Sequence, residues 1–180
     1  MATELISSKL VAPFYGTSIY VWAAIFSVTL IGLALGYYYG GKFSEEKASI
    51  AFFRKMLLLC TFFVLIMPFW SKFILGVTSD IFSLELGIIV SVLLFLFPPL
   101  FLFGMVSPFV IQFLSSTEKK GFGRVAGKVY AISTIGGVLA TFSFGFYFIP
   151  FSGVFMSSIY VFFMVLFGLL LTYIIKPKHA

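Results

Sequence analysis

The chain has 180 residues, of which 61% are hydrophobic, 21% aromatic and only 10% charged. Soluble domains carry about 25% charged residues. The 12 basic and 6 acidic side chains are too few to cover a water-exposed surface, so the composition excludes a soluble globular enzyme, and its apolar excess excludes a disordered chain. It predicts an all-α, polytopic bundle of transmembrane helices that forms a single domain over residues 1–180.

The predicted elements begin with a helical segment over residues 1–15, which Pro13 is expected to stop. Glu4 and Lys9 are expected at the outer end of this helix. The segment is too short to cross a membrane, because a crossing needs about 20 residues. It is therefore either the end of an incompletely present first membrane helix or a segment that lies on the outer membrane surface.

Five full spans follow, each placed where the charges leave room for about 20 mostly apolar residues. The longest uncharged block is interrupted by Pro98, Pro99 and Pro108. We therefore expect a kinked span and, after it, a shorter interfacial segment that begins at Ser107. A turn at residues 150–153 divides the last apolar block. The predicted spans are residues 18–39, 52–74, 86–105, 129–149 and 153–175.

The basic residues predict the orientation, since loops rich in Lys and Arg stay in the cytoplasm. Ten of the 12 follow the first, third and fifth predicted spans, and only Lys9 and Lys72 fall on the other side. We therefore expect a protein of the cell inner membrane with a cytoplasmic C-terminus. The net charge of +6 then reflects topology and predicts no nucleic-acid partner. On the cytoplasmic side Arg124 and Lys128 share a helix face that favours contact with anionic lipid headgroups.

Small residues recur every four positions on two of the predicted spans, so each set lies on one helix face. The first stripe consists of Gly32, Gly36 and Gly40, and the second of Ser133, Gly137, Thr141 and Gly145. This spacing predicts close packing of helices in the membrane. For the second stripe, the alternative is the polar lining of a path for a solute.

The pair Pro98-Pro99 removes two backbone donors in the middle of a span. It produces either a static kink or a notch that gates or binds a ligand. The candidate lining of a bundle cavity at this level is Ser91, Pro98, Pro99, Tyr130, Ser133, Thr134 and Thr141.

No catalytic, cofactor-binding or metal-binding site is predicted. The chain has one cysteine, Cys60, and one histidine, His179. From Ser18 to Ile175 no acidic residue falls in the middle of a predicted span, and Ser44-Glu45-Glu46 has the pattern of a helix start. A proton-coupled pump therefore lacks an obvious proton carrier, and the chain by itself is not predicted to be an enzyme.

Several motifs in one order resemble the membrane region of the integral-membrane spermidine synthase-like proteins. They are LVAPFYGTS at residues 10–18, GLALGYY at 32–38, GMVSPF at 104–109 and GRVAGKVYAISTIGG at 123–137. The resemblance implies half of a major-facilitator-like bundle that in this family is fused to a cytoplasmic aminopropyltransferase domain. That domain would follow the last span, and the chain ends at Ala180. The implied function is therefore an anchor or partner, in polyamine biosynthesis, of an aminopropyltransferase encoded separately.

The alternative is a small facilitator-like transporter or exporter of polyamines or another small solute. Two copies of a half bundle would pair to enclose a path, which makes a homo-oligomer the expected assembly. Cationic polyamines favour carboxylates along such a path, and the predicted spans supply none.

Overall fold

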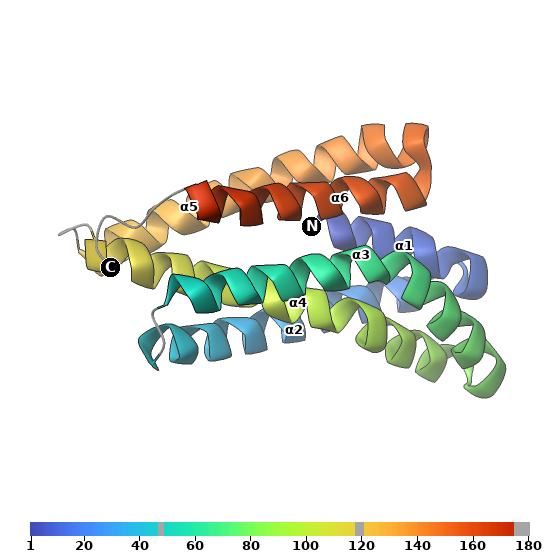
Figure 1. Ribbon diagram of the computed structural model, residues 1–180. Helices are drawn as coiled ribbons and strands as arrows, with labels where there is room; N and C mark the ends of the chain where they lie inside the picture. Colours follow the sequence, from blue (N-terminus) through green and yellow to red (C-terminus); the bar gives the residue numbers. More distant parts are fainter. Residues whose placement is uncertain (47–48, 118–120, 175–180) are drawn as a thin grey trace.

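The computed structural model describes the chain except residues 47–48, 118–120 and 175–180, and every element in the described part is helical (Figure 1). This confirms the all-α prediction. The helices are α1 (Ala2–Tyr15), α2 (Ile19–Glu46), α3 (Ile50–Ile81), α4 (Leu84–Thr117), α5 (Phe122–Ser143), the π-helical turn η1 (Phe144–Phe148) and α6 (Ile149–Ile174).

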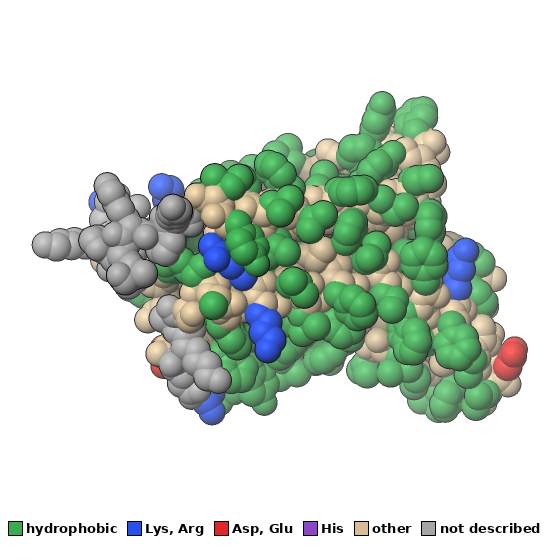
Figure 2. Space-filling view, in the orientation of Figure 1, with side chains coloured by type: hydrophobic (Ala, Val, Ile, Leu, Met, Phe, Trp, Pro, Cys, Tyr) green, Lys and Arg blue, Asp and Glu red, His purple; other side chains and the backbone are tan. Residues whose placement is uncertain are grey.

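Four helical stretches are long and apolar enough to cross a membrane: Ile19–Glu45, Ile50–Ile81, Leu84–Ser115 and Phe122–Ile174. The outer surface is correspondingly apolar over most of its length (Figure 2). These features fit a membrane protein whose helices contact the lipid bilayer.

The last stretch contains 53 residues and reverses direction within its length. At about 1.5 Å per residue, a straight helix of this size would be about 80 Å long, more than twice the roughly 30 Å of a bilayer core. Gly153 has φ 78° and ψ 171°, a conformation that side chains disfavour. The chain turns back there (Figure 1), at the position where the sequence predicted a turn, and α6 packs against α3 and α1.

The prediction of a separate interfacial segment after Met105 is wrong, because α4 continues without a break from Leu84 to Thr117. Its three prolines lie inside the helix. Proline in a helix costs about 3 kcal/mol, and burial of Phe95, Leu96 and Leu100 against the neighbouring helices offsets that cost.

The helix start predicted at Ser44-Glu45-Glu46 is also wrong, because α2 extends through these positions to Glu46. The Ser44 hydroxyl donates to the Gly41 carbonyl within the same helix, at 2.7 Å. The cap of the following helix is Ser49, whose hydroxyl oxygen accepts a hydrogen bond from the Ala51 backbone amide at 3.2 Å.

Helix α1 packs inside the bundle, which contradicts its placement on an outer surface. It contacts α2, α3, α4, α5 and α6, and its buried face includes Thr3, Glu4, Ile6, Ser7 and Val11. The N-terminus lies near the middle of the long axis of the bundle (Figure 1). Pro13 does not stop the helix, which ends at Gly16, where φ is 73°.

Helices α2 and α4 form the closest crossing of the bundle. The three glycines of the first predicted stripe lie on this interface, facing Leu100, Phe101, Gly104 and Met105 of α4. A Cβ atom added at Gly36 would lie 2.8 Å from the Gly104 Cα, and one added at Gly40 would lie 2.7 Å from the Met105 Cα. Backbone therefore faces backbone at this crossing, and a side chain on either glycine would force the helices apart.

We predict that Gly36→Ala destabilises the protein by about 1–3 kcal/mol, because the added methyl group overpacks the α2–α4 crossing. Alanine also has a higher helix propensity than glycine, by about 1 kcal/mol. Gly41→Ala controls for that gain, since no atom lies within 4 Å of a Cβ at this position of α2. Thermal unfolding of the two variants in detergent measures the difference, and equal transition temperatures would contradict the packing role.

Candidate functional site

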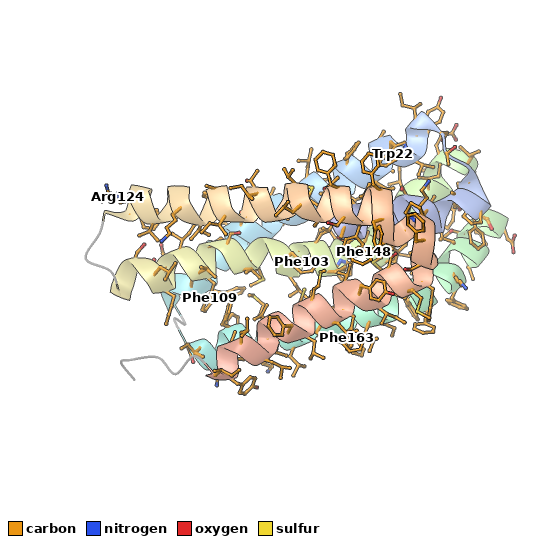
Figure 3. All side chains as sticks on the ribbon, turned by 90° about the horizontal axis from the view of Figure 1, so that it is seen from above. Trp22, Phe103, Phe109, Arg124, Phe148 and Phe163 are labelled. Atoms are coloured by element: carbon orange, nitrogen blue, oxygen red, sulfur yellow. The ribbon has the colours of Figure 1, made fainter. Side chains whose placement is uncertain are left out.

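A cavity of about 610 Å³ lies between α1, α2, α4, α5, η1 and α6, and it is the strongest candidate for a functional site. The first turn of α1 forms one wall. Helices α5 and α6 are joined at η1 and diverge from that point. Phe103 of α4 lies between them in the view of Figure 3. Polar groups on the walls come from Met1, Thr3, Glu4, Tyr37, Ser107, Ser133, Thr134 and Thr141. The apolar lining includes Leu33, Leu100, Phe103, Phe144, Val161 and Met164.

The sequence placed Glu4 at the outer end of a helix, and the structure places it deep in the bundle beside this cavity. Its exposed fraction is 6%. The neighbouring Met1 lies against the middle of the Phe122–Phe148 stretch, since a Cβ added at Gly137 would lie 3.2 Å from the Met1 Cγ. The expectation that Glu4 lies at the outer end of its helix is therefore wrong.

One oxygen of the Glu4 carboxylate accepts a hydrogen bond from the N-terminal ammonium group of Met1 at 3.4 Å. The second oxygen makes no hydrogen bond to another described residue, and it is not among the fully buried unpaired atoms, so it is open to the cavity. A carboxylate in a region of low dielectric constant is costly unless its oxygens are paired, so this group has unused binding capacity.

Three of the predicted lining residues, Ser133, Thr134 and Thr141, lie on the cavity wall. The Ser133 hydroxyl donates to the Tyr130 carbonyl at 3.0 Å, and the Thr141 hydroxyl donates to the Gly137 carbonyl at 2.8 Å. The Thr134 hydroxyl makes no hydrogen bond within the described part of the chain. The sequence pattern does not indicate Tyr37, Ser107 or the α1 residues as lining, because the depth of α1 depends on contacts between residues distant in the sequence.

Ser91 does not line the cavity, which corrects the sequence prediction. It is fully buried in a cluster of hydroxyl groups that joins α1, α3 and α4. The Tyr15 hydroxyl donates to Thr78 Oγ1 at 3.1 Å, and Thr78 Oγ1 lies 2.5 Å from Ser91 Oγ. The Ser91 hydroxyl also bonds to the Gly87 carbonyl at 2.6 Å. These groups satisfy one another and leave Ser91 no free position for a ligand.

The remaining predicted lining residues, Pro98, Pro99 and Tyr130, are also absent from the cavity walls. Pro99 is fully buried within α4, and the helix continues past both prolines. Tyr130 lies on the exposed surface of α5.

The second small-residue stripe faces α1 and the cavity, whereas the first faces a helix backbone. A Cβ added at Gly145 would meet only the side chain of Leu5, at 3.6 Å. Gly137 likewise faces the flexible Met1 side chain. Neither glycine lies at a close approach between backbones, so this stripe shapes the cavity wall more than it holds helices together.

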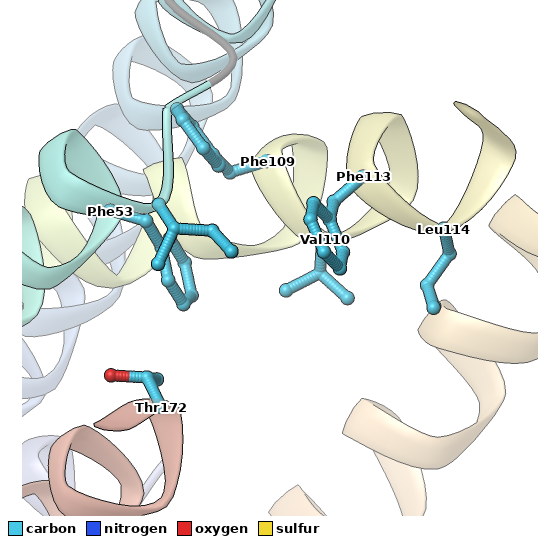
Figure 4. Close-up of a pocket in the computed structure, with 7 residues that line it drawn as sticks. Phe53, Phe109, Val110, Phe113, Leu114 and Thr172 are labelled. Atoms are coloured by element: carbon cyan, nitrogen blue, oxygen red, sulfur yellow. The ribbon is translucent and has the colours of Figure 1, made fainter. Parts of the chain in front are cut away.

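A smaller cleft of about 160 Å³ lies between α3, α4 and α6 at the end where the basic residues gather. Its walls are almost entirely apolar, with Phe53, Phe109 and Phe113 facing Thr172 across it (Figure 4). The guanidinium of Arg54 donates to the Thr172 carbonyl at 2.5 Å and lies 4.2 Å from the centroid of the Tyr173 ring. This contact fastens α3 to the last turn of α6. Thr172 is the polar residue of the cleft lining, and its hydroxyl donates to the Leu169 carbonyl of its own helix at 2.7 Å.

Arg124 and Lys128 are exposed on the first turns of α5. Neither forms a salt bridge within the described residues. Both side chains are therefore accessible from outside the bundle, and their contact with anionic lipid headgroups stays a prediction. Lys119 and Lys120 lie outside the described residues.

In the part of the chain that the structure describes, no group of three or more His, Cys, Asp or Glu side chains is placed to hold a metal ion. Comparison with known proteins found no matching family model, no matching curated protein and no matching solved structure. The function must therefore be argued from the site itself.

We predict that Thr78→Val destabilises the protein by about 1–3 kcal/mol, because it leaves the buried Tyr15 hydroxyl without a hydrogen-bond acceptor. Valine has nearly the same shape as threonine, so the lost free energy of unfolding reports the hydrogen bond and not a new cavity. Ser79→Ala is the matched control, since its exposed hydroxyl bonds only to the Gly76 carbonyl of its own helix. Thermal unfolding of both variants in detergent tests this, and an unchanged Thr78→Val transition would show that the cluster contributes nothing.

Proposed function

We propose that the chain is an inner-membrane protein with five crossings, α2 to α6, and with its basic end in the cytoplasm. The reversal at Gly153 supports the count, because it makes two crossings of the 53-residue stretch. Charge supports the orientation: Lys and Arg gather at one end of the molecule (Figure 2). The described residues at that end are Lys42, Arg54, Lys55, Arg124 and Lys128.

The function that the geometry supports best is facilitator-like transport of a small solute. The observation that carries this proposal is the cavity, which places a buried carboxylate and several hydroxyl groups at mid-depth in an apolar bundle. Polar and ionisable groups are expensive in a membrane interior, and they mark binding sites and solute paths. Glu4 supplies the carboxylate whose absence from the predicted spans counted against cationic polyamines.

The motifs resemble the membrane region of spermidine synthase-like proteins, and this resemblance implies half of a facilitator-like bundle, so two copies are proposed to pair around the solute path. In such transporters the site lies near the middle of the membrane, between two repeats. The divergence of α5 from α6 leaves the cavity bordered by these two helices (Figure 3). A second copy placed against them would complete the enclosure.

Uptake of labelled 1,4-diaminobutane into proteoliposomes tests transport. We expect uptake above that of empty liposomes, and we expect Thr134→Val to lower it about two- to tenfold, the value of one hydrogen bond. Thr17→Val makes the same chemical change outside the cavity, between α1 and α2, and should leave uptake unchanged. Transport is contradicted if the wild-type protein takes up no more than empty liposomes.

A second proposed function is that of membrane partner for a separately encoded aminopropyltransferase. The ordered motifs support it, and so does the basic end, which offers exposed Arg124 and Lys128 where a soluble enzyme would dock. This function needs no passage of solute, so it can be separated from transport by experiment.

Co-purification from native membranes through a C-terminal tag tests the partnership. We expect recovery of a protein with the methyltransferase fold, and a severalfold lower yield with the double variant Arg124→Glu and Lys128→Glu, because the docking charges are inverted. Lys72→Glu inverts one charge at the opposite end and should not change the yield. Absence of any such protein from the wild-type sample would defeat this function.

A further inference from the structure

The Glu4 carboxylate is the only charged side chain on the cavity walls that the structure describes. Its partner is the Met1 ammonium group, at 3.4 Å. Strong charge-assisted bonds of this type measure about 2.7–2.9 Å, so the pair is loose, and the Met1 side chain is 59% exposed. The contact shows that a primary ammonium group fits against Glu4 and that the ammonium group now there is weakly held.

Along α5, polar groups continue away from Glu4 toward the basic end. Thr134 presents a hydroxyl without a partner. Ser133 donates its proton to a carbonyl, so its oxygen remains free to accept one. Tyr37 and Ser107 line the same region from α2 and α4.

The rest of the cavity lining is largely apolar and includes Leu33 of α2, Leu100 and Phe103 of α4, and Val161 and Met164 of α6. The eight-residue separation of Ser133 and Thr141 corresponds to about 12 Å along the helix. A ligand that satisfies these walls carries positive charge at one end, a short apolar middle and a hydrogen-bonding group at the far end.

We infer that the cavity binds a small organic molecule through one primary ammonium group, with Glu4 as the counter-ion and Ser133 and Thr134 as hydrogen-bonding partners for its other end. This inference deepens the proposed transport function and rests on it for the use of the cavity. One ammonium group is sufficient, because a second would find no second carboxylate on the described walls. Once the ligand has replaced the Met1 ammonium group, the charge of Glu4 favours a cationic end group over an anionic one.

Three four-carbon probes that differ only at their ends test the inference: 4-amino-1-butanol, 1,4-diaminobutane and 1,4-butanediol. Isothermal titration calorimetry on the full chain in lipid nanodiscs, with any tag at the C-terminus, gives the three dissociation constants. We expect the amino alcohol to bind at least as tightly as the diamine, and the diol to bind at least about tenfold more weakly, since it lacks the charge-assisted bond. No detectable binding, a diol as tight as the amino alcohol, or a diamine more than tenfold tighter would each overturn the inference.

Glu4→Gln should weaken binding of the amino alcohol at least about tenfold, because the substitution removes the charge of the side chain and preserves its shape. The weak binding of the diol should stay unchanged. Glu4→Asp retains the charge and should bind the amino alcohol more tightly than Glu4→Gln does. Glu85→Gln removes an exposed carboxylate from the first turn of α4 and should bind like the wild type. Equal affinity of Glu4→Gln and the wild type would overturn the role of Glu4. If Glu4→Gln does not fold, the dissociation constants of the three probes on the wild-type protein still test whether the cavity binds an ammonium group.

Binding and transport can fail separately. Tight binding of the amino alcohol without uptake into proteoliposomes overturns the transporter function and supports the ammonium site. Uptake of 1,4-diaminobutane that Glu4→Gln does not change overturns the ammonium site and leaves the transporter function standing.

Discussion

The structure depends on one constraint: in hydrocarbon, every polar group must find its partner within the protein. The backbone meets it by forming helices throughout the described residues. Hydroxyl side chains meet it by donating to carbonyls one turn back, as Ser7 does to Thr3, Thr61 to Leu57 and Ser157 to Gly153. Some groups do not complete their hydrogen bonds: the hydroxyl groups of Ser18, Thr29 and Ser115 are buried without a partner among the described residues. Thr134 and the second oxygen of Glu4 differ from these because they lie on the wall of the cavity, where a ligand can reach them.

The same constraint explains which helices hold the bundle together. Without water to drive apolar surfaces together, membrane helices associate by close packing, and small residues allow the closest approach. Gly36 and Gly104 bring α2 and α4 into contact at the backbone level. By contrast, α5 has Val125 as its only buried residue. The α2–α4 pair is thus the stable frame, and α6 is held against α3. The cavity lies between this frame, the first turn of α1, the loosely packed α5 and α6.

The sequence pattern was sufficient for features that depend on local chemistry. Scarcity of charge predicted the helical class, and Pro150 to Gly153 predicted the last reversal. The sequence pattern gave wrong predictions where tertiary packing determines how far a helix continues or how deep it lies. Pro108 does not end α4, because the helix is buried on both sides of the proline-rich segment, at Phe95 and Phe109.

The candidate site was predicted in part for the same reason. Ser133 and Thr141 share one face by helical spacing alone, so the sequence could place them together. Ser91 is a serine like Ser133, but its surroundings are determined by Thr78 and Tyr15, which are distant in sequence. The sequence pattern therefore could not show that Ser91 lies outside the cavity. Glu4 lies near the start of the chain, and its depth follows from the burial of Ile6 and Val11 in the bundle core. One oxygen of Glu4 accepts from the Met1 ammonium group in the first turn of α1, so the start of the helix explains that contact. The second oxygen makes no hydrogen bond to a described residue, and the binding of a cation from the cavity accounts for it.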